Sequence, residues 1–196
     1  MIGLLWWADR LIRLADARGG LWIDRALLDW LLSHRQPALD RFFLTVTWAG
    51  SLYLLIPVTL AVVIALAWRG RIREAALTAL SLAGASLLTH AVKLLTTRPR
   101  PAATDLLTPM PLDWSFPSAH TAQITALAVS LALLKTGGWT LWSGAGGLLA
   151  LGLIAAVGLS RVYLQVHFLS DVIMGALLAT LWVLGLIGLN KWLTAV

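Results

Sequence analysis

Three short stretches hold almost every ionisable group in the hydrophobic two-thirds of this chain. Together they contain two arginines, a lysine, two histidines and one carboxylate. These residue types can supply a nucleophile, a proton donor and a positive clamp, and they suit phosphoryl transfer without a metal. The stretches are Lys93 followed by Arg100-Pro101, then Pro117-Ser118-Ala119-His120, then Ser160-Arg161 followed by His167 and Asp171.

The second and third stretches each have a local logic. Pro117 and Ser118 are favoured at a helix start, where the free amides of the next turn and the helix dipole can bind a phosphate. His120 would lie beside that phosphate. His167 and Asp171 have the helical i, i+4 spacing, so we expect both in the opening turns of one helix. The carboxylate can hold one imidazole nitrogen as N–H and leave the other free to attack.

The cations of these stretches form the expected clamp. Lys93, Arg100 and Arg161 would neutralise the charge that spreads over the equatorial oxygens of an in-line transition state. Arg98 also precedes a proline, two residues before Arg100. On the residues alone, either arginine could enter the site.

The composition places this chemistry in a membrane. Of the 196 residues, 59% are hydrophobic and 12% are charged, which is far more apolar than a soluble domain. Several uncharged runs reach about 20 residues, the length needed to cross a bilayer. We predict an all-α integral membrane protein, a bundle of five to six transmembrane helices with N-terminal amphipathic helices in the interface. The five clearest spans are Phe42 to Trp68, Ala75 to Val92, Ala119 to Leu134, Leu141 to Leu159 and Val172 to Leu189.

The first 41 residues differ from the rest. Charged residues such as Asp16, Asp24 and Arg25 interrupt each apolar run before it can span, while apolar residues recur at helical spacing. This pattern is typical of amphipathic helices that lie in the interface. A sixth span there would bury these charges, at a high cost unless they paired internally. We therefore divide the chain into interfacial helices at 1–41 and a single transmembrane core at 42–196.

Membrane topology also accounts for the basic character of the chain, whose formal net charge is +6. Arg69, Arg71 and Arg73 cluster in one short connection, as the positive-inside rule expects of a cytoplasmic loop. We therefore predict no nucleic-acid partner. The sequence has no cysteine, which excludes disulfides and thiolate metal sites.

The predicted spans bring the three stretches to one face of the membrane. The second span starts beside the arginine-rich connection and ends near Lys93, on the opposite side. The third span starts on that side at Ser118, the fourth returns to it at Arg161, and the fifth departs with His167 and Asp171 in its opening turns. The proline-rich loop 97–116 between the first two stretches cannot be helical.

Taken together, the stretches resemble the signature of the type 2 phosphatidic acid phosphatase superfamily. The matching patterns are Lys-x6-Arg-Pro, Pro-Ser-x-His and Ser-Arg-x5-His-x3-Asp, and they extend from Lys93 to Asp171. That superfamily groups membrane lipid phosphatases with vanadium haloperoxidases and bacterial acid phosphatases. Its spacing favours Arg100 over Arg98 as the clamp residue, so we expect Arg98→Ala to be mild. The family usually has glycine where this chain has Ala119, which we expect to tune the pocket without removing activity.

The resemblance implies a role for each matched residue. His167 would be the nucleophile that becomes phosphorylated, Asp171 would orient it, and His120 would protonate the leaving group. No metal and no other cofactor is implied. The groups that would hold the phosphoryl group are Lys93, Arg100, Ser118, the amide of Ala119 and Arg161.

By the same resemblance, the chain would be a membrane lipid phosphatase that removes a terminal phosphate from a lipid phosphate or diphosphate. Undecaprenyl diphosphate, phosphatidylglycerophosphate and phosphatidate all fit, and the residues do not decide among them. A phosphotransferase that passes the group to lipid A or another lipid would share every motif. A transporter or structural membrane protein could use the same charges to gate a pathway. We expect a multi-pass protein of the bacterial inner membrane whose site faces the periplasm or the cell exterior; the sequence indicates no oligomeric state.

Overall fold

The computed structural model describes residues 3, 10, 21–102, 105–133 and 145–193. Within these residues every regular element is a helix, which confirms the predicted all-helical fold. The elements are α2 (Trp22–Ser33), α3 (Pro37–Val46), the short 3₁₀ helix η1 (Thr47–Gly50), α4 (Leu52–Trp68), α5 (Ile72–Thr96), α6 (Ala119–Leu133), α7 (Ala145–Tyr163) and α8 (Leu169–Leu193).

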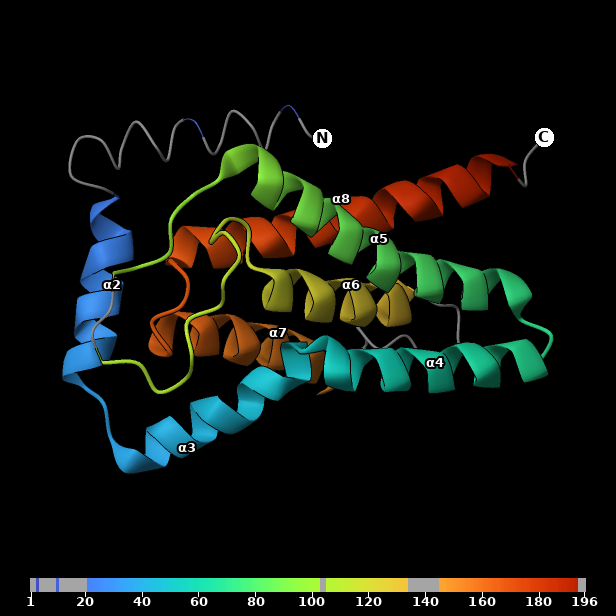
Figure 1. The fold of residues 1–196 in the computed structure, drawn as a ribbon. Coiled ribbons are helices and arrows are strands. Elements are labelled where there is room, and N and C mark those ends of the chain that lie inside the picture. Colours follow the sequence, from blue (N-terminus) through green and yellow to red (C-terminus); the bar gives the residue numbers. More distant parts are fainter. Residues whose placement is uncertain (1–2, 4–9, 11–20, 103–104, 134–144, 194–196) are drawn as a thin grey trace.

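Helices α4 to α8 run along one another as a bundle, and α2 lies across one end of it (Figure 1). Within the described part, three helices are long and apolar enough to cross a membrane: α5, α7 and α8. The pair formed by α3–η1 and α4 makes a fourth span if it is counted as one, although it bends by 46°. Helix α6, Ala119–Leu133, is also apolar but shorter, with 15 residues. The chain is therefore a multi-pass membrane protein.

The predicted span from Phe42 to Trp68 is broken near its start. Helix η1 ends at Gly50, and α4 begins after Ser51, whose Oγ accepts a hydrogen bond from the amide of Tyr53 at 3.3 Å. A Cβ atom on Gly50 would lie 2.9 Å from the Cβ of His120, which is closer than real side chains approach. The glycine therefore lets the break contact the first turn of α6, where His120 lies.

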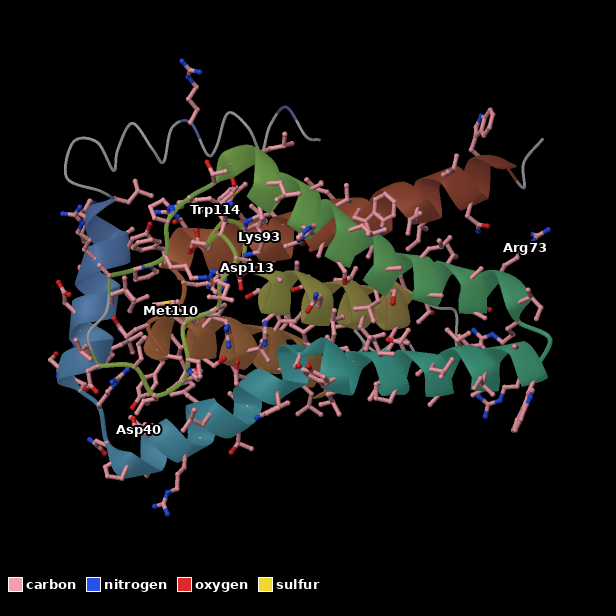
Figure 2. The ribbon with its side chains drawn as sticks, viewed as in Figure 1. Asp40, Arg73, Lys93, Met110, Asp113 and Trp114 are labelled. Carbon is pink, nitrogen blue, oxygen red and sulfur yellow. The ribbon has the colours of Figure 1, made fainter. Side chains whose placement is uncertain are left out.

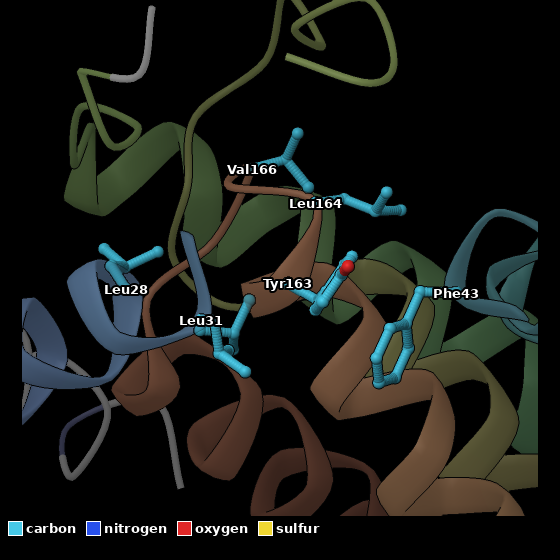
Figure 3. Close-up of a cluster of buried hydrophobic side chains, with 7 residues drawn as sticks. Leu28, Leu31, Phe43, Tyr163, Leu164 and Val166 are labelled. Atoms are coloured by element: carbon cyan, nitrogen blue, oxygen red, sulfur yellow. The ribbon is translucent and has the colours of Figure 1, made fainter. Parts of the chain in front are cut away.

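A cluster of buried apolar side chains holds α2 and α3 against the end of the bundle (Figure 3). Leu28 and Leu31 come from α2, Phe43 from α3, and Tyr163 from the end of α7. The rings of Phe43 and Tyr163 lie 4.3 Å apart between centroids. Because burial of apolar surface stabilises such contacts, one face of α2 is fixed to the core.

The opposite face of α2 is exposed and aromatic. Trp22 and Trp30 are 77% and 55% exposed. Indole rings favour the membrane–water interface, so this face suits the interfacial position predicted for the region. Of the predicted N-terminal helices, the segment before residue 21 lies almost entirely outside the described residues, and the boundary at residue 41 stays a prediction.

The starts of α6 and α8 are held together by a close backbone contact. The amide of Ser118 donates to the carbonyl of Asp171 at 3.0 Å. A Cβ on Gly175 would lie only 2.6 Å from the carbonyl oxygen of Ser118, so only glycine allows this approach. The contact brings the second and third sequence stretches together.

Candidate active site

A cavity of about 250 Å³ lies where the three stretches meet. Lys93 and Asp113 mark that end of the bundle in Figure 2, and Arg73 lies at the other end. The structure therefore brings the stretches to one face, as the predicted spans required. Six of the predicted site residues line the cavity: Lys93, Arg100, Ala119, His120, Arg161 and His167.

His167 lies in the turn between α7 and α8 and not in a helix. Helix α8 begins at Leu169, so the prediction that His167 opens this helix is wrong, and only Asp171 lies in its first turn. The turn contains Gln165 with a positive φ of 60°, which few residues other than glycine adopt. The side-chain amide of Gln165 donates to the carbonyl of Leu28 in α2 at 3.0 Å. Helix α2 thus helps to hold the turn that carries His167.

The imidazole of His167 is held between a carboxylate and an arginine. Its Nδ1 lies 3.3 Å from Oδ2 of Asp171, and because a carboxylate only accepts, Nδ1 carries the hydrogen. Its Nε2 lies 3.1 Å from Nη1 of Arg100, on the side of the cavity. Burial lowers the pKa of His167 to about 3, even though Asp171 acts in the other direction. At neutral pH the ring is uncharged, and its Nε2 accepts from Nη1 of Arg100 at the edge of the cavity that both residues line.

Asp171 is buried among four donors, of which Nδ1 of His167 is one. Its Oδ2 accepts from the Ser115 hydroxyl and, at 2.9 Å, from the Phe168 amide, and its Oδ1 lies 2.6 Å from Nη1 of Arg98. Arg98 is itself only 1% exposed. This direct contact with Asp171 argues against the expectation that Arg98→Ala is mild. Of the two neighbouring arginines, Arg100 is the one that lines the cavity.

Asp113, which the sequence did not single out, binds two of the three clamp cations. Its Oδ2 lies 3.1 Å from Nζ of Lys93, and its Oδ1 accepts from Nη2 of Arg100. Burial raises the pKa of Asp113, but Lys93 and Arg100 outweigh that effect, so its pKa lies below the ordinary value. The carboxylate is therefore ionised, and a phosphate in the cavity would compete with it for both cations.

Arg161 and the start of α6 complete the cavity. The Arg161 side chain is buried, and its Nη1 donates to the hydroxyl of Thr47 at 2.7 Å. Its Nε has no hydrogen-bond partner among the described residues. Ser118 is also buried, but its hydroxyl accepts from Thr121 at 3.1 Å and it does not line the cavity. The structure therefore places the Ala119 end of α6, and not the Ser118 side chain, at the cavity wall.

An apolar groove of about 500 Å³ runs between α4 and α5 beside the cavity. Leu52 lines both the groove and the cavity. Ser86 in the groove accepts a hydrogen bond from Gln123 of the cavity wall at 3.3 Å. A charged cavity and an apolar groove are thus adjacent.

The family model of the PAP2 superfamily matches residues 74–194, more than half of the sequence. The chain belongs to the PAP2 superfamily. The matched range contains all three stretches, so the family resemblance predicted from them is confirmed.

Several individual proteins are similar to this chain in sequence or in fold. An undecaprenyl-diphosphatase of Sulfolobus acidocaldarius is 43% identical over 82 residues, which cover 41% of this chain and 35% of that protein. The chain thus matches about a third of the length of this relative. A PAP2 type phosphatidylglycerolphosphate phosphatase from Bacillus subtilis has the same fold, with a TM-score of 0.81, 24% identity, and 96% of this chain and 92% of that chain covered. LpxE of Aquifex aeolicus gives a TM-score of 0.70 with 26% identity, and the match covers 86% of this chain and 96% of LpxE.

Proposed function

We propose that this PAP2 protein is a phosphatase that hydrolyses the terminal phosphate of a lipid phosphate or diphosphate through a phosphohistidine intermediate. One observation carries the proposal. His167 lines a cavity together with Lys93, Arg100 and Arg161, with its Nδ1 against Asp171 and its Nε2 beside Nη1 of Arg100. An oriented neutral nucleophile and a ring of cations are what an in-line displacement at phosphorus requires.

The proposed reaction has two displacements at one phosphorus. Nε2 of His167 forms a bond to phosphorus, the bond from phosphorus to the leaving oxygen breaks, and His120, which enters the step protonated, gives that oxygen a proton. In the second step neutral His120 takes a proton from water, the water oxygen bonds to phosphorus, the bond from phosphorus to Nε2 breaks, and inorganic phosphate is released. Asp171 stabilises the positive ring while it is phosphorylated. The unpaired Nε of Arg161 would donate to a phosphate oxygen.

The apolar groove supports a lipid as substrate. A hydrocarbon chain lying between α4 and α5 would end beside Leu52, which also lines the phosphate cavity. The relatives named for undecaprenyl diphosphate and phosphatidylglycerolphosphate both act on such molecules, by their names. We therefore place undecaprenyl diphosphate, phosphatidylglycerophosphate and phosphatidate in the substrate class.

The deciding experiment is an assay of the purified protein against these three lipids, with free phosphate as the readout. Thin-layer analysis of the lipid products belongs in the same assay. A phosphatase releases free phosphate in proportion to the lipid lost. Phosphate that appears instead on a second lipid would show a transferase, and no change in any lipid would contradict the proposal.

We expect turnover to survive excess EDTA and to be inhibited by vanadate. The positive charge for the transition state comes from Lys93, Arg100 and Arg161, which all line the cavity. Among the described residues, no three His, Asp or Glu side chains gather as metal ligands would. Vanadate can adopt the five-coordinate geometry of the displacement and should bind among these cations. Loss of phosphate release in EDTA, with recovery on addition of magnesium, would exclude metal independence.

We further propose that the cavity faces the periplasm or cell exterior, with the helices of 1–41 in the outer interface. Because the chain has no cysteine, single cysteines report sidedness directly. Leu112 is fully exposed near the cavity, and Ile72 is 60% exposed beside the arginine-rich connection. Leu112→Cys should react with a membrane-impermeant maleimide in intact cells, and Ile72→Cys only after lysis. Labelling of Ile72→Cys alone in intact cells would show the inverted orientation. By the same topology we expect Thr104 on the outer side and Gly138 on the cytoplasmic side; both positions lie outside the described residues.

A further inference from the structure

A buried ion network joins α2 to the start of α8. Oδ2 of Asp24 lies 3.2 Å from Nη2 of Arg98, and Nη1 of Arg98 lies 2.6 Å from Oδ1 of Asp171. None of the three residues is more than 1% exposed. Burial of charges is costly unless each is paired and hydrogen-bonded, so a network of this kind calls for a physical reason. Neither Asp24 nor Arg98 lines the phosphate cavity.

Ser170 completes the connection between Asp24 and α8. Its amide donates to Oδ1 of Asp24 at 2.9 Å, and its hydroxyl donates to Oδ2 at 2.6 Å. The same hydroxyl accepts from Nη1 of Arg98 at 2.8 Å. Both oxygens of Asp24 are therefore engaged, and the position of α2 is fixed relative to the residue before Asp171.

Because Arg98 binds one oxygen of Asp171, the two oxygens of this carboxylate have different partners. Oδ1 faces Arg98, which leaves Oδ2 to face Nδ1 of His167. Rotation of the carboxylate would break the contact with the arginine. Arg98 thus orients Asp171 toward His167, and Asp24 holds Arg98 in place.

The network also has a net charge that matters for the reaction. Counting these three side chains, Arg98 and Asp171 would be neutral together, and Asp24 makes their sum negative. The ring of His167 becomes positive when its Nε2 bonds to phosphorus. A negative group behind the ring stabilises that charge, and the buried surroundings strengthen the effect.

We propose that Asp24 is a positioning residue for phosphoryl transfer: through Arg98 it fixes Asp171 and keeps the group behind His167 negative. The inference rests on the proposed function, because it takes His167 as the nucleophile. Helix α2 is then part of the active site as well as an interfacial element.

The first variant to measure is Asp24→Asn, which keeps the size of the side chain and removes its charge. We expect kcat and the rate of phosphoenzyme formation to fall about 10- to 100-fold, the range found for outer partners of metal-bound histidines. KM and inhibition by vanadate should stay within about threefold, because the clamp around the cavity is unchanged. Asp29→Asn, an exposed position on the same helix, is the matched control and should behave as the wild type.

The double variant Asp24→Asn with Arg98→Gln separates charge from docking. It removes one negative and one positive charge, so the single negative charge of Asp171 remains, which equals the net charge of the three wild-type side chains. The glutamine amide can still donate to the Asp171 carboxylate. We expect its kcat to exceed that of Asp24→Asn. If the pair served only to dock α2, the folded double variant would show no such recovery.

Two results would overturn the inference: Asp24→Asn as fast as Asp29→Asn, or a folded double variant no faster than Asp24→Asn. If Asp24→Asn does not elute as a folded protein, the double variant and Asp24→Glu, which keeps the negative charge, take its place in the comparison. If either of these variants folds but is as inactive as His167→Ala, the inference is overturned. The same series includes His167→Ala. An active His167→Ala would refute the proposed function, whereas an inactive one beside a fully active Asp24→Asn would refute this inference alone.

Discussion

Replacement of His167 by alanine is expected to lower kcat by at least about 10⁴-fold, because the nucleophile of a two-step transfer has no substitute. Nε2 of His167 faces the cavity, and Nδ1 is held by Asp171. The wild-type protein, denatured during turnover of a labelled lipid phosphate, should carry a phosphate that is labile in acid and stable in base. Radiolabel on the protein band after alkaline quenching measures this intermediate.

His90→Ala is the matched control for that measurement, since His90 is exposed on α5 and lies outside the cavity lining. It should turn over and become labelled like the wild type. His120→Ala should be slow chiefly with poor leaving groups, because His120 supplies their proton. Normal turnover in His167→Ala, with no trapped phosphoenzyme in the wild type, would be incompatible with the mechanism.

Substitution of Arg161 by lysine is expected to lower kcat about 10²- to 10³-fold, the loss typical of a preorganised donor at a developing charge. The guanidinium uses Nη1 to bind Thr47 and keeps a buried Nε without a partner among the described residues. A lysine has one ammonium group and cannot make both contacts from this position. Steady-state assays with a lipid phosphate measure the effect.

Arg41→Lys gives the comparison for this change, because Arg41 is exposed on α3 and does not line the cavity. It should leave kcat unchanged. Arg100→Ala should be about as damaging as Arg161→Lys, since Arg100 contacts both His167 and Asp113. Full activity in Arg161→Lys would mean that Arg161 supports the fold and does not contact the phosphoryl group.

The helices could be predicted from the sequence because long apolar runs have few structures open to them in a bilayer. The break after Gly50 could not. The run from Phe42 to Trp68 carries no charge, and Gly50 at its bend packs closely against His120, about 70 residues further along the chain. A hydrophobic pattern reports the length of a span and says little about bends that tertiary contacts impose.

The cavity residues could be predicted because their spacing forms a family pattern, but their partners could not. Arg98 contacts Asp171 across 73 residues and Asp24 across 74, and neither pairing has a local signal. The charges of the N-terminal region indicated an exposed helix face, with internal pairing as the condition for burial. Asp24 meets that condition. Asp113 lies in a loop, where an acidic residue is ordinarily a solvated one.

The hydrogen bonds between Asp24 and Ser170 join positions 146 residues apart, so their formation depends on the order in which the chain is synthesised. During synthesis, α2 emerges long before α8, and the buried arginine between them has no complete set of partners until α8 has been inserted. Contacts of such long range form late in folding. A partly synthesised chain would therefore hold His167 and Asp171 in no fixed geometry, and hydrolytic competence would appear only after α8 has packed against α2.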